Sequence, residues 1–315
     1  MQNKPPINLG NNIFLIDGFD LGMPSRTGSY VLDEDELTIV ETGPSPSVPY
    51  IVQGLKELGK TPEMVKYIIV THIHLDHAGG AGVLLEQCPH AKVIVHPRGE
   101  RHLIDPSKLA AGARAVYGDK FDALFDPIKA IPEDRLIVKH EGDTLKIGEN
   151  RTLEFLDTPG HAKHHFSIYD PVSNGMFTGD TVGIRYEELE KDGIYLYLPT
   201  TSPNHFDPDA MLDSIDRIRK RNIDKIYFGH FSVTENVEEV YRQVSDWIPL
   251  FVKEGEKALS KGKDDKTIYT GLMNLINNHL SQYDLPENHP VYPILELDLQ
   301  VSAMGIADYL RKKKR

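Results

Sequence analysis

The stretch THIHLDH brings together four side chains that can bind a metal ion: His72, His74, Asp76 and His77. Neutral imidazole and carboxylate groups are the usual ligands of zinc and similar divalent ions. An isolated histidine is more often a buried side chain satisfied by the backbone, but three histidines and an aspartate within six positions favour a metal site. They also exceed the number of ligands that one open catalytic metal requires.

The elements that flank this cluster give it a place in a fold. Residues 67–70 form an apolar run typical of a strand buried on both faces, and residues 81–88 have helical spacing. The cluster therefore lies on a strand-to-helix turn. In open α/β sheets, ligands bind at the carboxyl ends of the strands, because loops there bring side chains together without interrupting the hydrogen-bonded ladder.

Three more candidate ligands lie at the ends of other predicted strands. They are His161 after LDTPG, Asp180 after FTG and His230 after IYFG. All three occupy strand-end positions equivalent to that of the first cluster. We therefore count them as candidates for the same site.

Short predicted strands and helices alternate along the first 230 residues. The predicted strands lie at 12–18, 29–43, 65–71, 91–97, 135–140, 152–158, 165–170, 175–180 and 225–230. The predicted helices between them lie at 48–59, 81–88 and 208–221. From residue 235 onward the pattern is helical, broken by a proline-rich segment at 283–293. This order predicts an α/β (α+β) protein with a C-terminal helical extension.

Composition sets limits on partners and on location. The chain has 315 residues, 40% of them hydrophobic, which is enough for one large domain or two modest ones. Its net charge of −12 argues against binding of long nucleic acids, and the basic end at 311–315 is typical of a solvated tail. Cys88 is the single cysteine, so no intrachain disulfide can form. Without a signal-peptide or membrane-spanning pattern, we expect a soluble, cytoplasmic protein with no membrane partner.

The motifs HxHxDH, TPGH, GD and GH, in this order, resemble those of the metallo-β-lactamase-fold hydrolase superfamily, which includes glyoxalase II and lactonase branches. The resemblance covers about residues 10–231 and implies a four-layer αββα sandwich with a binuclear metal site at one edge of the sheets. We therefore expect a catalytic domain at 1–231. Its helical insertion at about 99–134 is either a lid or a surface decoration. A C-terminal extension at 232–315 would pack on the core or on a partner subunit, as in a homodimer.

Carried over residue by residue, the resemblance assigns the seven candidate ligands to two ions. It implies that one ion is bound by His72, His74 and His161, that the other is bound by Asp76, His77 and His230, and that Asp180 bridges them. The ions would be divalent transition metals, zinc first, with manganese or iron as alternatives. His74 argues against the flavin-associated di-iron branch, which generally has a glutamate at this position.

The same resemblance implies a reaction. Two ions activate a bridging water, which Asp76 helps to orient, so no serine or cysteine nucleophile is needed. The favoured function is hydrolysis of a carboxylic ester, lactone or thioester in a small molecule. Two alternatives stay open: a small phosphodiester hydrolase, and a metal-containing regulatory or binding protein with weak activity.

Several positions near the motifs bear on the substrate. Glu41, in VETG, replaces the aspartate that is common in the family, and we expect it beside the metal ligands. Gly183 stands where lactonases usually have a tyrosine, and the Gly-Cys-Gly-Arg stretch of glyoxalase II is replaced as well, so neither substrate is assigned. Arg185, Tyr186 and Tyr195 are candidate substrate contacts, with packing or a solvated loop as the alternative.

Overall fold

The computed structural model describes residues 4–314 and divides the chain into two compact units. The first unit comprises residues 4–157, His164–Gly179 and Ile223–Val237; the second comprises Thr158–Lys163, Asp180–Asn222 and residues 238–314. Residues 1–3 and residue 315, at the outer ends of the two predicted domains, lie outside the described residues. Along the sequence, segments of the second unit thus alternate with segments of the first.

The first sheet of the first unit has seven strands among the described residues. Their bounds are β1 (Ile7–Asn8), β2 (Ile13–Asp17), β3 (Gly28–Leu32), β4 (Thr38–Val40), β5 (Tyr67–Ile69), β6 (Lys92–Val95) and β7 (Leu136–Val138), in spatial order. Strands β1 to β4 pair antiparallel and β4 to β7 pair parallel. The strand predicted at 29–43 is two strands, because the acidic residues at 33–36 form a turn between β3 and β4.

The second sheet of this unit has six strands within residues 4–314, in the order β15-β14-β11-β10-β9-β8. Their bounds are β8 (Thr144–Lys146), β9 (Thr152–Asp157), β10 (Phe166–Asp170), β11 (Gly175–Gly179), β14 (Lys225–Phe228) and β15 (Val233–Thr234). All neighbours pair antiparallel except β11 and β14, which are parallel. The carboxyl ends of β11 and β14 therefore meet at one edge of the sheet.

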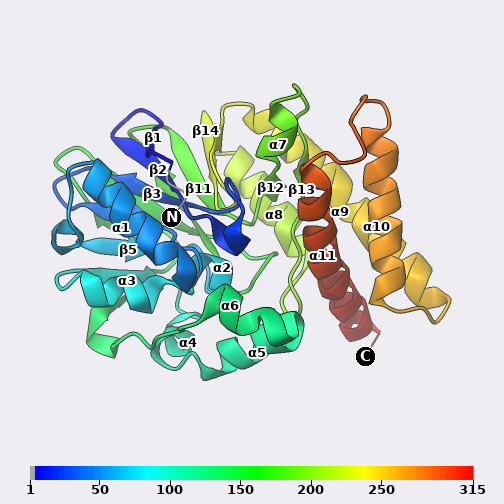
Figure 1. Ribbon diagram of the computed structural model, residues 1–315, viewed down its shortest axis with the longest axis horizontal. Helices are drawn as coiled ribbons and strands as arrows, with labels where there is room; N and C mark the ends of the chain where they lie inside the picture. The colour runs from blue at the N-terminus through cyan, green and yellow to red at the C-terminus, as the bar shows by residue number, and fades with distance from the viewer. Residues whose placement is uncertain (1–3, 315) are drawn as a thin grey trace. The chain divides into compact units, whose positions relative to one another are not determined.

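Strand β5 lies between two hydrophobic cores. Ile68 packs in a cluster with residues of α1 (Val48–Glu57) and α3 (Ala81–Gln87), which lie over this strand in Figure 1. The next residue, Ile69, packs with Phe155 and Phe177 of the second sheet. Successive side chains of a strand point to opposite faces, so β5 is apolar throughout because both of its faces are covered. The predicted α/β sandwich is confirmed.

The C-terminal helices belong to the second unit and pack on other parts of it. They are α9 (Val237–Ser260), α10 (Asp265–Leu280) and α11 (Val291–Lys313). In α11, the Ser302 carbonyl accepts a hydrogen bond of 2.7 Å from the Thr201 hydroxyl, and a side chain at Gly305 would lie 2.6 Å from the same hydroxyl. The predicted helical C-terminus is confirmed, and α11 lies directly against the segment around Thr201.

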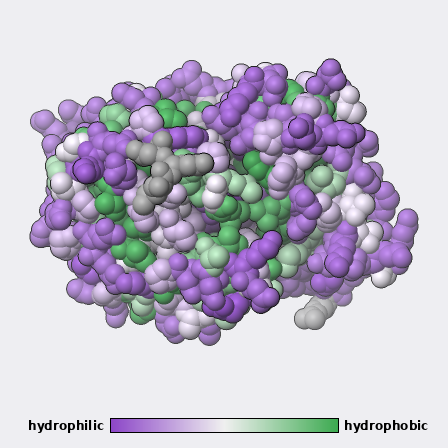
Figure 2. Space-filling model, viewed as in Figure 1, coloured by the Kyte–Doolittle hydropathy of each residue, from purple (hydrophilic) through white to green (hydrophobic). Residues whose placement is uncertain are grey.

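The surface is largely polar. Figure 2 shows hydrophilic residues over most of the face in view. Large apolar side chains that are clearly exposed are scattered along the described chain: Ile7, Met64, Val172, Tyr195, Leu250 and Tyr283. Within residues 4–314 we find no helix with the length and apolar character needed to cross a bilayer.

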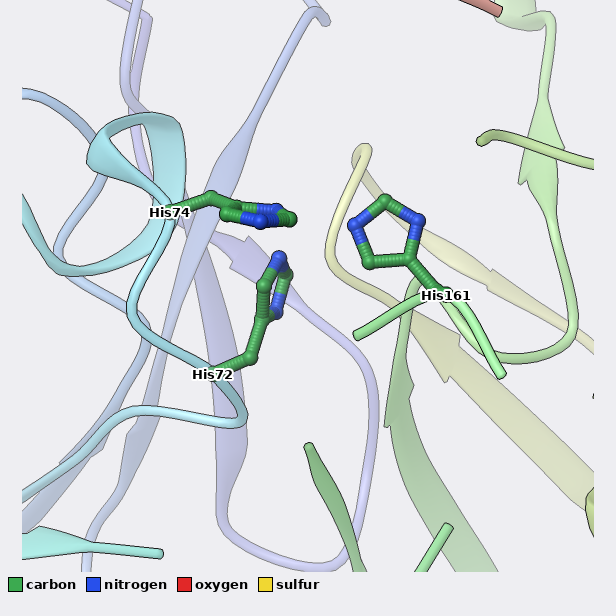
Figure 3. A group of neighbouring side chains, drawn as sticks. All are labelled: His72, His74 and His161. Atoms are coloured by element: carbon green, nitrogen blue, oxygen red, sulfur yellow. The ribbon is translucent and has the colours of Figure 1, made fainter. Parts of the chain in front are cut away.

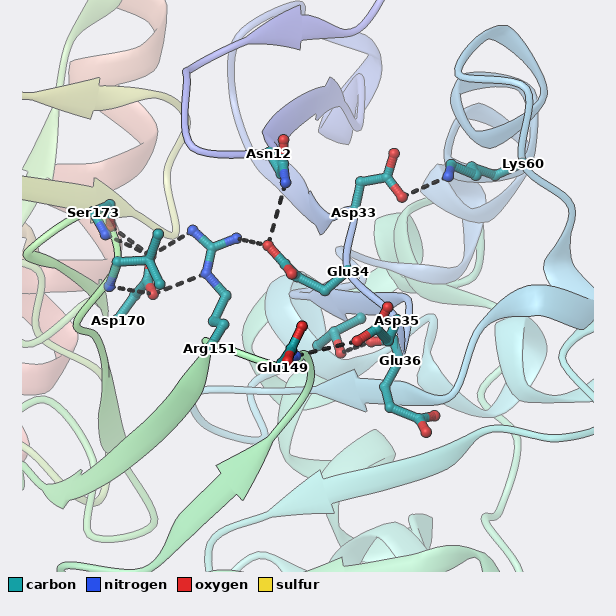
Figure 4. A network of polar contacts seen from close by, with 12 residues as sticks. Asn12, Asp33, Glu34, Asp35, Glu36, Lys60, Glu149, Arg151, Asp170 and Ser173 are labelled. Carbon is teal, nitrogen blue, oxygen red and sulfur yellow. Dashed lines mark hydrogen bonds and ion pairs between the residues drawn. The ribbon is translucent and has the colours of Figure 1, made fainter.

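A buried arginine joins the two sheets of the first unit (Figure 4). Arg151, which precedes β9, donates two hydrogen bonds of 3.0 Å to the carboxylate of Asp170 at the end of β10. Its third nitrogen donates to Glu34, in the turn between β3 and β4, at 2.8 Å. Arg151 is 1% exposed and Asp170 is fully buried. These contacts lie where β4 and β9 begin, opposite the strand ends that carry candidate ligands.

Replacing Arg151 by Ala should lower the free energy of unfolding by about 3–5 kcal/mol, because it leaves a buried carboxylate without its cation. Arg242 is the matched control, since it also pairs with two carboxylates but is exposed on α9. Its replacement by Ala should cost about 0–1 kcal/mol. Urea unfolding followed by circular dichroism measures both. Equal losses in the two variants would show that the buried network does not hold the sheets together.

Candidate metal centre

The turn that carries the first candidate ligands is fixed by its backbone. It runs from the end of β5 into the one-turn helix α2 (Leu75–Ala78), with His74 in extended conformation before the helix. The carbonyl of His77 accepts two hydrogen bonds from Thr42, one from its backbone N–H at 3.0 Å and one from its hydroxyl at 2.9 Å. Thr42 follows β4, so the neighbouring strand holds the turn in place.

Asp76, His77 and His230 come together in the first unit. Each offers one ligand atom, and these atoms lie within 4.8 Å of one another. Nε2 of His77 and Nε2 of His230 lie 3.8 and 3.6 Å from Asp76 Oδ2. A side chain at Gly229 would lie 2.5 Å from the His77 ring, which explains the glycine of the GH motif. Two imidazoles and a carboxylate are a ligand set that suits a divalent transition metal.

His72 and His74 lie on the same turn, and Figure 3 shows their rings edge to face. The ring centroids are 4.5 Å apart with an interplanar angle of 85°. The His72 ring is also 4.1 Å from that of His77. Nδ1 of His72 contacts the Thr71 hydroxyl at 3.1 Å. A contact at one ring nitrogen fixes the orientation in which the other nitrogen can bind a metal.

His161 and Asp180 lie close together in the second unit. Nε2 of His161 is 3.5 Å from Asp180 Oδ2, and both residues are 2% exposed. Nδ1 of His161, on the loop after β9 (Figure 3), lies 2.9 Å from the Thr200 carbonyl oxygen. A carbonyl can only accept, so Nδ1 carries the proton and Nε2 the lone pair that a metal needs. Each unit thus contains buried donors from the predicted set of seven.

Glu41 lies beside this set. One of its carboxylate oxygens accepts a hydrogen bond from the Thr71 N–H at 3.1 Å, and the other is 3.3 Å from Nδ1 of His77. Its backbone φ of 66° is in the left-handed region, which is strained for a residue other than glycine. A carboxylate on the second ring nitrogen orients a histidine ligand and raises its basicity. Glu41 can therefore position His77.

The insertion packs on the ligand turn. Its helices are α4 (Glu100–Ile104), α5 (Ser107–Tyr117) and α6 (Phe121–Phe125). Phe121 and Phe125 are buried against Leu75, which stands between His74 and Asp76 in the motif. The Ser45 hydroxyl lies 2.6 Å from the Pro127 carbonyl oxygen and 3.0 Å from that of Gly79, and it donates to one or the other. The insertion thus supports the ligand turn, and its role as a lid or a surface decoration stays a prediction.

The candidate substrate contacts have partners inside the second unit. Arg185 donates to Glu190 at 2.8 Å and lies 3.3 Å from Glu187. The Tyr186 hydroxyl is buried and donates to Asp298 of α11 at 3.1 Å. Tyr195 is 49% exposed. Packing and pairing account for the first two side chains, and contact of the three with a substrate stays a prediction.

Asp20 is a polar residue near the ligands that sequence reasoning missed. It is 3% exposed in a short 3-10 helix at Asp20–Gly22, between β2 and β3. Burial raises its pKa to about 6, the positive charge of Arg26 lowers it, and the negative charge of Asp76 raises it. No motif marks this loop. A hydrogen bond of 3.4 Å from the Gly28 N–H to the Gly229 carbonyl joins the end of this loop to the residue before His230.

Comparison with known proteins identifies the family of this chain. The family model of the metallo-beta-lactamase superfamily matches residues 24–230, more than half of the chain. A metallo-beta-lactamase fold-containing protein of Sulfurisphaera tokodaii is 31% identical over 184 residues, which are 57% of this chain and 63% of that protein. A hydroxyacylglutathione hydrolase of Idiomarina loihiensis is 30% identical over 152 residues, 48% of this chain and 43% of that protein. The chain thus spans less than two thirds of the length of both relatives.

A solved structure shows the same fold. A metallo-beta-lactamase family protein from Thermus thermophilus superposes with a TM-score of 0.68 at 20% identity, covering 98% of this chain and 95% of that one. The family match covers all seven candidate ligands, and the superposition covers the C-terminal helices as well. The chain belongs to the metallo-beta-lactamase superfamily.

Proposed function

We propose that this protein is a binuclear metal-dependent hydrolase that cleaves a carboxylic ester, lactone or thioester of a small molecule. The observation that carries the proposal is the convergence of Asp76, His77 and His230 at the ends of their elements. It is supported by membership of a superfamily that includes hydrolases. When bound, divalent ions would supply Lewis acidity and an activated water.

The ligands divide between two ions in this proposal. One ion would be held by His72, His74 and His161, the other by Asp76, His77 and His230, with Asp180 shared by both. Support comes from the family motifs and from the buried donors in each unit. Zinc suits a set of imidazoles and carboxylates best, and manganese or iron would also be accepted.

Asp76 has a second role in the proposal. Its side chain is 28% exposed, whereas the side chains of His77 and His230 are 1% and 6% exposed. It is therefore the ligand that reaches solvent, and its second oxygen can accept a hydrogen bond from the attacking water. Glu41, whose Oε2 lies 3.3 Å from Nδ1 of His77, would orient that ring, and the Thr200 carbonyl keeps the proton of His161 on Nδ1.

The choice of a carboxyl bond rests on the relatives and on the charge of the chain. A hydroxyacylglutathione hydrolase among the relatives favours a carboxyl substrate. The net charge of −12 disfavours a long polyanionic substrate such as nucleic acid, although the same ions would also suit a small phosphodiester. A small neutral or weakly charged carboxyl compound is therefore the substrate class to test first.

Protein purified without chelators should contain close to two transition-metal ions per chain. Replacing Asp180 by Ala should lower the affinity for both ions at least tenfold, because a shared carboxylate would bind both. Asp216→Ala, in an exposed ion pair with Lys220 on α8 (Pro208–Arg219), is the control and should retain both. Elemental analysis and competition with a chromophoric chelator measure this. Loss of one ion in Asp180→Ala would disprove the bridge, and metal-free wild-type protein that takes up no metal would overturn the proposal.

Hydrolysis should fall as the pH drops below about 6. The histidine ligands must be neutral to bind metal, and the attacking water must lose a proton whose pKa is about 7 in comparable zinc sites. Initial rates on a lactone, an aryl ester, a thioester and a bis(aryl) phosphate, from pH 5 to 9, test both the profile and the bond type. A phosphodiester kcat/KM well above the best carboxyl substrate would reassign the bond. Absence of turnover on all four would favour a regulatory metal-binding protein.

A further inference from the structure

The loop between β2 and β3, residues 18–27, buries a carboxylate that the proposed reaction does not use. Asp20 is 3% exposed, and its Oδ1 has no hydrogen-bond partner among the described residues. Burying an ionisable oxygen without a partner is unfavourable, and such a group in a folded protein calls for an explanation. The neighbouring Phe19 and Leu21 have φ values of 46° and 55°, in the left-handed region. Strain of this kind gathers at functional sites.

The loop is held firmly in its conformation. One oxygen of Asp17 accepts a hydrogen bond from the Phe19 N–H at 3.0 Å, and the other accepts from the Ser25 N–H at 2.9 Å. Lys4 pairs with the second oxygen at 2.9 Å. The Phe19 ring stacks on Tyr50 with centroids 4.8 Å apart. Asp20 is therefore buried in a loop whose conformation is fixed by hydrogen bonds, an ion pair and ring stacking.

The loop lies beside the cluster of Asp76, His77 and His230. Its two ends are joined by a hydrogen bond of 3.0 Å from the Gly18 N–H to the Thr27 carbonyl, and the next residue, Gly28, donates to the Gly229 carbonyl. Arg26, Asp76, His230 and His77 are the charged or titratable groups that influence the Asp20 carboxyl. The negative charge of Asp76 opposes that of Asp20, whereas a cation held by these three ligands would favour it.

We propose that Asp20 is an outer anion of this metal site: its carboxylate binds no ion directly, but its negative charge stabilises a divalent cation held by Asp76, His77 and His230. The charge of Asp20 has opposite effects on the metal-free and the metal-bound protein. Without metal, the buried charge costs folding stability. With metal, the same charge is attracted to the ion through a medium of low dielectric constant, where attraction is strong. The inference rests on the metal site of the proposed function, but not on its reaction.

Stability and metal affinity together distinguish a charge that acts on the ion from a side chain that only supports the loop. Asp20→Asn keeps the shape of the side chain and removes the charge. The variant should make the metal-free protein more stable and should bind metal more weakly. If Asp20 only held the loop in place, Asp20→Asn would lower the stability of the metal-free protein. If Asp20 had no influence on the ion, the variant would bind metal as tightly as the wild type.

The stability gain should depend on pH. The pKa of Asp20 is raised from 3.8 in a model compound to about 6, so the folded protein binds its proton more tightly than the unfolded chain does. Wild-type stability therefore falls as the pH rises through that window. The advantage of Asp20→Asn in urea unfolding of metal-free protein should be largest at pH 7.5 and should shrink progressively as the pH falls through 6 towards 4.

Metal affinity is measured with Co²⁺ alone, by competition with a chromophoric chelator and by the visible absorption of the bound ion. Asp20→Asn should lower the affinity for one of the two Co²⁺ ions about tenfold and should leave the affinity for the other within twofold of wild type. Asp119→Asn is the control, because Asp119 is exposed and its replacement changes net charge by the same amount. It should change neither affinity nor stability.

The outcomes separate this inference from the proposed function. Wild-type affinity for both ions in Asp20→Asn, or a loss of stability in its metal-free form, would overturn the role of Asp20 and leave the metal site standing. Failure of the wild-type protein to bind Co²⁺ would overturn both. Turnover of substrates is not used, so a wrong assignment of the bond cannot affect the result.

Discussion

The turn at 72–77 has to bury its apolar side chains while its polar side chains converge, and much of the first unit follows from this constraint. Ile73 packs in the core beneath α1 and α3, whereas Leu75 packs on Phe121 of the insertion. Thr42 fixes the His77 carbonyl from the neighbouring strand. Because the backbone is held from several sides, little freedom is left to the side chains of the candidate metal ligands. Such preorganisation lowers the entropy lost when an ion is bound.

The backbone around the candidate ligands is strained at several residues. Glu41, Phe231 and Ser232 have φ values of 66°, 67° and 69°, and the last two directly follow His230. Each such residue costs on the order of 1–3 kcal/mol. Hydrogen bonding helps to hold this backbone. The Tyr30 hydroxyl lies 2.6 Å from the carbonyl oxygens of Phe228 and Ser232, on either side of His230. The backbone at the site is therefore kept in a conformation that it would not adopt alone.

Charge is handled differently at the two ends of the strands. At the start of β9, Asp170 is neutralised by the guanidinium of Arg151, so that end is complete without a ligand. At the other end, the carboxylates of Asp20 and Glu41 are buried near the candidate metal ligands, with one Glu41 oxygen 3.3 Å from Nδ1 of His77. A bound cation would complete the balance there. The Arg151 end is thus balanced in charge by the chain itself, whereas the other end would be balanced by a bound cation.

The sequence by itself determined the family and the first candidate ligands, because four donors within six positions are placed by a single turn, whatever the rest of the chain does. It also determined the change from strands to helices near residue 235, which follows from local periodicity. Only the tertiary structure decided that the insertion supports Leu75, that Arg151 reaches Glu34 across the sheets, and that Asp20 lies near His230. These contacts join residues far apart in the chain, and no local spacing encodes them, since they depend on how complete strands and loops pack.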